Sequence, residues 1–158
     1  LATVIGTAGD DLLVGTPGDD VFAGRGGNDR ILAGAGDDLV CAGDGDDEVW
    51  TGPGDDTAWG GAGGDRLYGE DGDDRLYGED GDDLLWGGEG EDALAGGAGD
   101  DRLLGHEGDD LLAGGPGVNY LWGGEGADAL FGFGPADTLS GDDRDTCRSA
   151  GHLVTCWR

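Results

Sequence analysis

A nine-residue period governs this chain from Gly6 to Ser140 and runs through fifteen consecutive repeats without an insertion or deletion. With Gly6 as position one of the first repeat, position six is Asp in fourteen of the fifteen repeats, and Asn119 is the exception. Position four is Gly in every repeat except the last, which has Pro135, and position eight is always apolar. Because nine residues cannot bury their own apolar side chain, the repeats are expected to stack in a linear array.

The chemistry of the positions predicts the shape of one coil. Positions seven to nine place a constant apolar residue between variable ones, which indicates a three-residue strand whose middle side chain points inward. Positions one to six are rich in Gly and Asp and indicate a tight turn that needs positive φ. Two repeats then form one coil, with a short parallel sheet on each face and a turn on each edge. At about 4.8 Å per coil, the array extends roughly 36 Å.

The charge of the chain restricts what it can bind. Its 36 acidic residues face only 8 basic ones, all Arg, and the net charge is -28 over 158 residues. With 39 Gly and 36% hydrophobic residues, the metal-free chain is expected to be largely disordered, because little apolar surface opposes ordering entropy and self-repulsion. Nucleic acid and membrane insertion are disfavoured, because the Arg residues are dispersed and no apolar run reaches the length of a spanning helix. Metal cations are the expected partners.

Other motifs that could use so many carboxylates do not fit. An EF-hand loop requires alternating acids, then Gly and a late Glu, whereas Asp71 and Asp73 are followed by Arg75, and no flanking helix is readable. The sequence contains no Ser-centred nucleophile elbow and no metalloprotease His pair, and His106 and His152 lie in unrelated contexts. We therefore expect no enzymatic activity from this chain.

The repeat resembles the RTX (repeats-in-toxin, hemolysin-type) nonapeptide G-G-x-G-x-D-x-U-x, a calcium-binding parallel β-helix repeat. The resemblance covers about 85% of the chain. It implies an all-β fold, a right-handed parallel β-roll (β-solenoid) with about 18 residues per coil, about seven and a half coils and a short C-terminal cap. The expected organisation is a partial N-terminal coil over 1–5, fifteen repeats over 6–140, and a cap over 141–158.

The resemblance also implies that position-six carboxylates and backbone carbonyls of the turns bind Ca²⁺ between successive coils. Hard oxygen ligands suit Ca²⁺, and lanthanides would fill the same sites. Counting gaps between turns gives up to about 13 ions, which would bring the net charge to about -2. The array weakens after Asn119, where sites are expected to be weaker or absent. The expected ligands are Asp11, Asp20, Asp29, Asp38, Asp47, Asp56, Asp65, Asp74, Asp83, Asp92, Asp101, Asp110 and Asp128.

The acids at position five are a separate row. Successive side chains of an extended turn point apart, so we favour a supporting electrostatic role over direct ligation for this row. It consists of Asp10, Asp19, Asp37, Asp46, Asp55, Asp73, Asp82, Glu91, Asp100 and Asp109.

The three cysteines differ in their setting. Cys147 and Cys156 lie close together after the repeats and are expected to form a disulfide, whereas Cys41 stands alone within the repeats. A disulfide is typical of proteins outside the cytosol, so the protein is expected to be secreted. The simplest role of 141–158 is to cover the apolar side chains and strand edges of the last coil.

Position nine is expected to face outward, and on one face it is apolar in seven successive coils. Two interpretations stay open. Outward strand positions favour aromatics for cross-strand packing, and an apolar strip of this length also suits a homodimer, domain or sugar-polymer contact. The residues of this row after Val14 are Leu32, Trp50, Tyr68, Trp86, Leu104 and Trp122.

These observations together predict a secreted calcium-binding module that folds on Ca²⁺ and serves a structural or adhesive role. One alternative is a calcium-dependent C-terminal module of a larger secreted enzyme or toxin. A second is an ice- or carbohydrate-binding solenoid. Ice binding is disfavoured because no regular Thr or Asn row exists at position three, which begins Ala8, Pro17, Gly26 and Ala35.

Overall fold

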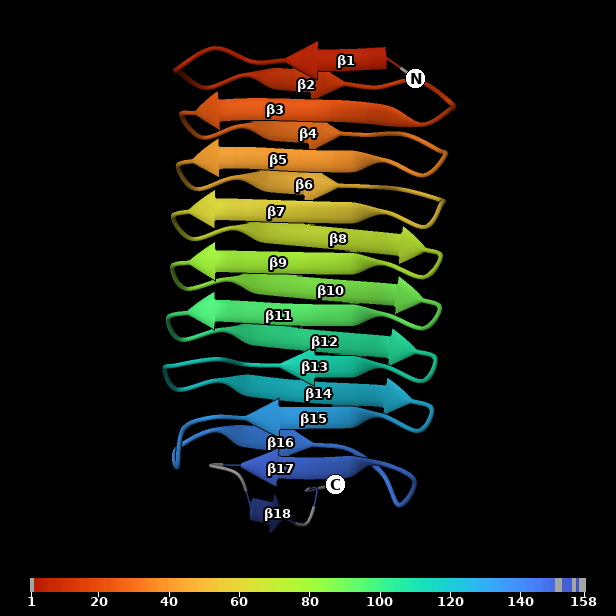
Figure 1. The fold of residues 1–158 in the computed structure, drawn as a ribbon, viewed down its shortest axis with the longest axis vertical. Coiled ribbons are helices and arrows are strands. Elements are labelled where there is room, and N and C mark those ends of the chain that lie inside the picture. Colours follow the sequence, from red (N-terminus) through yellow and green to blue (C-terminus); the bar gives the residue numbers. More distant parts are fainter. Residues whose placement is uncertain (1, 150–151, 155, 157–158) are drawn as a thin grey trace.

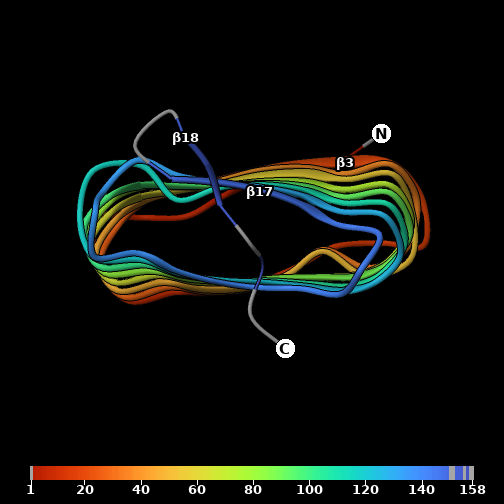
Figure 2. The ribbon, with the colours of Figure 1, turned by 90° about the horizontal axis from the view of Figure 1, so that it is seen from below.

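Strands of this chain pair with the strands one coil before and after them rather than with their sequence neighbours. The computed structural model describes residues 2–149, 152–154 and 156. In it, Leu85 lies beside Leu67 and Leu103, its counterparts two repeats before and two repeats after, in parallel register. The strands therefore stack along one axis (Figure 1), and the view along that axis shows the coils superposed as a flattened ring (Figure 2). The expected all-β parallel β-solenoid, with two repeats in each coil, is confirmed.

The strands form two sheets, one on each broad face of the ring. The ten-stranded sheet contains β1 (Ala2–Ile5), β3 (Asp20–Gly26), β5 (Leu39–Asp44), β7 (Thr57–Ala62), β9 (Arg75–Asp80), β11 (Ala93–Ala98), β13 (Leu111–Ala113), β15 (Ala129–Gly132), β17 (Thr146–Ser149) and β18 (His152–Val154). The eight-stranded sheet contains β2 (Leu12–Val14), β4 (Arg30–Leu32), β6 (Glu48–Trp50), β8 (Arg66–Asp71), β10 (Leu84–Glu89), β12 (Arg102–Glu107), β14 (Tyr120–Glu125) and β16 (Thr138–Ser140). No helix that could span a membrane occurs among the described residues.

The core is a single column of apolar side chains between the two sheets. All fifteen position-eight residues are buried, as their constant apolar character predicts. Position one also faces inward, so Ala33, Ala42 and Thr51 are fully buried where other repeats have Gly. The column is narrow because each coil contributes only two position-eight side chains.

Many strands are longer than the three residues that we predicted. β8, for example, has six residues and continues from position seven through position three of the next repeat. In register with it, Glu70 pairs with Gly88 and Asp71 with Glu89, so positions two and three join the backbone ladder between coils. Only positions four to six remain as the turn. Position two nevertheless has positive φ in most repeats, and Glu70 adopts it with φ 81° although it is not Gly.

The C-terminal end adds one more strand to the ten-stranded sheet. β17 pairs in parallel with β15, and Cys147 lies beside Leu130, one residue closer in sequence than the usual spacing of two repeats. β18 then returns antiparallel to β17 at this end of the solenoid (Figure 2). The expected disulfide is present: Cys147 and Cys156 are bonded, with 5.5 Å between their Cα atoms. Cys147 is buried, and Cys156 packs against the core, while Cys41 is an exposed free thiol.

Candidate metal centre

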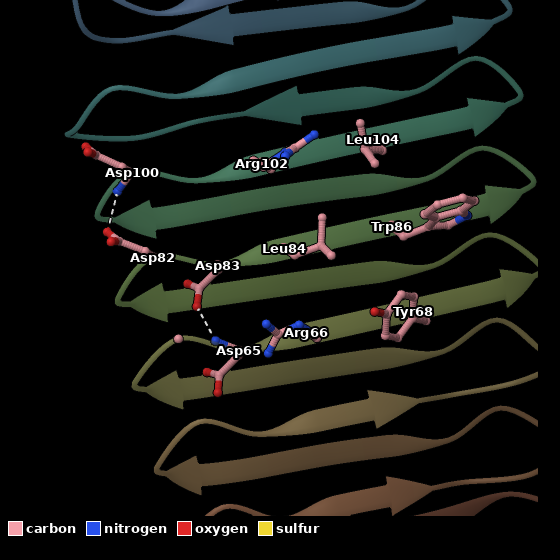
Figure 3. A pocket seen from close by; sticks show the side chains of 11 residues that line it. Asp65, Arg66, Tyr68, Asp82, Asp83, Leu84, Trp86, Asp100, Arg102 and Leu104 are labelled. Carbon is pink, nitrogen blue, oxygen red and sulfur yellow. Dashed lines mark hydrogen bonds between the residues drawn. The ribbon is translucent and has the colours of Figure 1, made fainter.

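The position-six aspartates form a buried row along each edge of the solenoid. Each reaches back one coil with one carboxylate oxygen: Asp83 Oδ1 accepts the backbone N–H of Asp65 at 2.8 Å (Figure 3), and Asp74 Oδ1 accepts that of Asp56 at 2.8 Å. The same bond recurs from coil to coil on both edges, from the pair Asp11 and Asp29 onward. Oδ1 therefore ties neighbouring coils together without any metal.

The second carboxylate oxygen has no such partner through the middle of the ladder. Oδ2 of eleven position-six aspartates is buried and accepts no hydrogen bond from any group in the described part of the chain. A buried charged oxygen without a donor is costly, so each needs a cation or a proton. The eleven are Asp29, Asp38, Asp47, Asp56, Asp65, Asp74, Asp83, Asp92, Asp101, Asp110 and Asp128.

Burial and mutual repulsion both raise the pKa values of these carboxyl groups. Loss of hydration on burial, with the neighbouring charges of Asp92, Asp56 and Asp55, outweighs the lowering effect of the Asp56 amide and raises the pKa of Asp74 to about 8. Burial likewise raises the pKa of Asp110 to about 7. The metal-free ladder is therefore poised to hold either protons or cations at neutral pH.

Backbone carbonyls complete a cradle that fits a calcium ion. A Cβ added to Gly69, at position one, would lie 2.6 Å from the carbonyl oxygen of Gly87 and would clash with Asp74 Oδ2. The orphaned carboxylate oxygen and a carbonyl of the next coil thus border the same space. No three carboxylate, imidazole or thiol groups converge anywhere in the described part of the chain, so the remaining ligands of a cation here would be carbonyls or water. Hard oxygen donors of this kind match Ca²⁺.

Near both ends of the ladder, the protein itself satisfies the second oxygen. Asp11 and Asp20 were expected to be ligands, but in each the Oδ2 atom accepts the backbone N–H of a Thr in the same turn. They are therefore less suited to a cation than the eleven orphaned carboxylates. The contacts run from the amides of Thr7, Thr16, Gly134 and Asp142 to the Oδ2 atoms of Asp11, Asp20, Asp137 and Asp145, respectively.

Asp145 is a ladder member that sequence reasoning missed. Its Oδ1 accepts the backbone N–H of Asp128 at 3.0 Å, as a position-six residue does, and Cys147 then fills the core position two residues later. A single missing residue in the preceding turn breaks the nine-residue frame and hides this repeat. The recurrence of an Asp two residues before a buried apolar residue is the signal that could have found it.

The position-five acids form a second ladder of opposite direction. Asp82 Oδ1 accepts the backbone N–H of Asp100 at 2.8 Å (Figure 3), so this side chain reaches forward one coil, whereas position six reaches back. Asn28 makes the same contact to Asp46 at 3.1 Å, so the bond does not require a charge. These side chains are exposed. They join adjacent turns by hydrogen bonds, and the supporting electrostatic role of this row stays a prediction.

The outward aromatic row packs across strands. Trp50 stacks on Tyr68 with 5.3 Å between ring centroids, and Trp86 stacks on His106 at 4.0 Å. The Arg30 guanidinium covers Trp50 at 4.7 Å from the ring centroid. Stacking between coils turns the ring faces toward neighbouring side chains rather than toward solvent. The described residues therefore form no aromatic cluster that would support an oligomer face.

A hollow of about 550 Å³ lies beside this row, on the outer face of β8, β10 and β12 (Figure 3). Arg66 and Arg102 border it, with Leu84 between them, and the acids of the nearby turns close one side. Gly64, which stands where other repeats have a position-five side chain, also lines it. Its cationic, acidic and apolar groups are mixed and do not select one class of ligand.

Comparison with protein-family models agrees with this geometry. The family model of the RTX calcium-binding nonapeptide repeat (4 copies) matches overlapping segments at residues 5–40, 41–76, 59–94, 68–103, 86–121, 104–134 and 113–145. No curated protein matches the chain. Among solved structures, the extracellular lipase LipA from Serratia marcescens is similar with 20% identity and a TM-score of 0.30, over 88% of this chain and 32% of the lipase. The chain thus spans about a third of that lipase. Since the family model matches far more than half of its residues, this chain belongs to the family of RTX calcium-binding nonapeptide repeats.

Proposed function

We propose that this chain is a secreted calcium-binding module whose folding is coupled to Ca²⁺. The observation that carries the proposal is the row of eleven buried carboxylate oxygens that accept no hydrogen bond. Family membership indicates the identity of the cation, and the carbonyl-lined cradle suits a hard ion of this kind.

The orphaned oxygens set the number of ions that we expect. One Ca²⁺ for each orphaned Oδ2 gives about eleven, two fewer than the 13 carboxylates expected as ligands, because Asp11 and Asp20 are satisfied within their own turns. Eleven divalent ions would reduce the net charge of -28 to about -6. Asp74 and its equivalents would hold the ion through Oδ2, and carbonyls such as that of Gly87 would add ligands from the next coil.

Calcium binding and folding would be one event. The ligands of each site come from coils that are adjacent only when stacked, so the binding free energy contributes directly to the free energy of folding. Millimolar extracellular calcium is in the range that extracellular modules use, and a structural disulfide suits the same compartment. We propose a structural or adhesive role for the folded module rather than catalysis.

A calcium titration tests the proposal. The chain is followed by circular dichroism in chelator and then in rising Ca²⁺, and calorimetry counts the bound ions, with Mg²⁺ as the control cation. We expect a cooperative gain of β structure with about eleven ions, and little response to Mg²⁺, which prefers a rigid octahedral shell. A chain that is fully folded in chelator, or that binds only two or three ions, would refute the proposal.

A further inference from the structure

Asn119 stands in the position-six row and makes a contact that no aspartate of the row makes. Its side chain is buried, with 2% exposed. Oδ1 accepts the backbone N–H of Asp101 at 2.8 Å, so the tie to the previous coil is kept. Nδ2 donates to the carbonyl oxygen of Gly115, four residues earlier in the same turn, at 2.9 Å.

The amide nitrogen of Asn119 occupies the place that the orphaned oxygen takes in other turns. A Cβ added to Gly114 would lie 2.8 Å from Nδ2, and a Cβ added to the equivalent Gly105 would clash with Asp110 Oδ2. The position-two carbonyl is thus within hydrogen-bonding reach of this place. An aspartate presents an acceptor to that carbonyl and needs a cation between them, whereas the amide supplies its own donor.

We infer that Asn119 replaces one calcium ion by a hydrogen bond and makes the turn 114–119 independent of metal. The inference rests on the proposed function, because it assumes that the aspartate turns bind Ca²⁺. It follows that this turn has no calcium site at all, rather than a site of lower affinity. The Asn119 amide makes both hydrogen bonds, to the Gly115 carbonyl and from the Asp101 N–H, without burying a charge.

The turn of Asn119 lies near the C-terminal end of the solenoid, where neighbouring turns also need no ion. Beyond Asn119 on the same edge, Asp137 accepts the N–H of Gly134 at 2.7 Å and has no orphaned oxygen. The Cys147–Cys156 disulfide holds the strand that follows. In the last coils, the turns of Asn119, Asp137 and Asp145 therefore need no ion, although Asp128 still does, and these coils form a seed that is more ordered in chelator than the coils before them.

The variant Asn119→Asp tests the inference by restoring a carboxylate. We expect it to bind one more Ca²⁺ than the wild type, counted by calorimetry, and to lose β structure in chelator. Val118→Asp is the matched control, because it adds the same charge one residue away at an exposed position, and it should leave the ion count unchanged. The reciprocal variant Asp101→Asn should bind one ion fewer and gain structure in chelator.

Hydrogen exchange in the wild type gives a second readout that does not depend on any variant folding. The side-chain amide protons of Asn119, assigned by NMR, should exchange slowly in chelator as well as in Ca²⁺. Rapid exchange in chelator, or an Asn119→Asp variant with the wild-type ion count, would overturn the inference. A wild type that binds no Ca²⁺ at all would instead refute the proposed function.

Discussion

Replacing Asp74 by Ala or by Asn separates two contributions of the position-six ladder. Oδ1 of Asp74 accepts the N–H of Asp56 at 2.8 Å, and Oδ2 has no partner. Ala removes both oxygens, whereas Asn keeps the Oδ1 acceptor and removes only the charge. The buried Asp56 amide left unpaired by Ala costs about 1–3 kcal/mol. At about 2–4 °C per kcal/mol for a chain of this size, Asp74→Ala should melt roughly 2–12 °C below Asp74→Asn in saturating Ca²⁺.

Asp74→Asn should change rank relative to the wild type when calcium is removed. In Ca²⁺, both Asp74 variants lose one bound ion and are less stable than the wild type. In chelator at pH 7, Asp74→Asn should be more folded than the wild type, because burial raises the pKa of Asp74 to about 8 and the free-energy cost of burying that carboxyl group disappears with it. This reversal distinguishes a ligand carboxylate from one that is merely structural.

Thermal melts by circular dichroism and ion counts by calorimetry provide the assay, with Asp73→Asn as the matched control. Asp73 is exposed at position five, and its Oδ1 accepts the N–H of Glu91 at 2.8 Å, a bond that Asn preserves. The control removes the same charge and should bind the full number of ions. Equal melting temperatures for the two Asp74 variants would refute the hydrogen-bond argument, and loss of an ion from Asp73→Asn would refute the separate roles of the two rows.

Four other perturbations test separate parts of the fold. In chelator, lowering the pH from 8 to 5 should increase the β structure measured by circular dichroism. The folded-state pKa values of about 7 for Asp65 and about 8 for Asp74 lie above the ordinary value of 3.8, so protonation stabilises the fold fully below pH 3.8, and this stabilisation is lost as the pH rises through 7 to 8. A pH-independent signal would contradict the reasoning. Glu79→Gly should raise the free energy of unfolding in urea by about 1 kcal/mol, since Glu79 has φ 78°, and an unchanged value would show that the strain is negligible. Gly81→Ala should prevent calcium-induced folding, because φ is 139° and the added methyl would overlap the carbonyl of Gly63; normal folding would disprove the close approach. Replacing Cys147 and Cys156 together by Ser should cost about 2–3 kcal/mol, measured by urea unfolding, whereas Cys41→Ser should have no effect; equal results for the two would argue against a stabilising disulfide.

Much of the fold could be predicted because the repeat is short and its frame is unbroken from Gly6 to Ser140. A constant apolar residue every nine positions is compatible with a core only if repeats stack, and two repeats per coil bring every residue into contact with its counterpart two repeats away. The register of Leu67, Leu85 and Leu103 follows from the nine-residue period and the two repeats per coil alone. The pairing of Cys147 with Cys156 was predictable for a similar reason, since they are close in sequence and Cys41 is far away.

Other features depend on atoms that the repeat cannot specify. The strands extend through positions two and three because adjacent coils pair there, although the Gly-rich composition indicates a turn. Asp145 continues the ladder across a one-residue deletion, because a shorter turn still delivers its carboxylate to the N–H of Asp128. The outward aromatics meet face to face along the axis, which favours cross-strand packing over an open contact surface.

By itself, the sequence determined which residues stack: the period places every Asp above another Asp and every apolar residue above another, and this requires a solenoid with acidic edges. Only the tertiary structure decided which carboxylate oxygens lack a donor. Asp11 and Asp74 occupy the same position of the repeat, but Thr7 donates to Oδ2 of Asp11, whereas the turn around Asp74 points no donor at its Oδ2. The difference lies in the orientation of a few backbone amides in one turn, which depends on how that turn packs against its neighbouring coils.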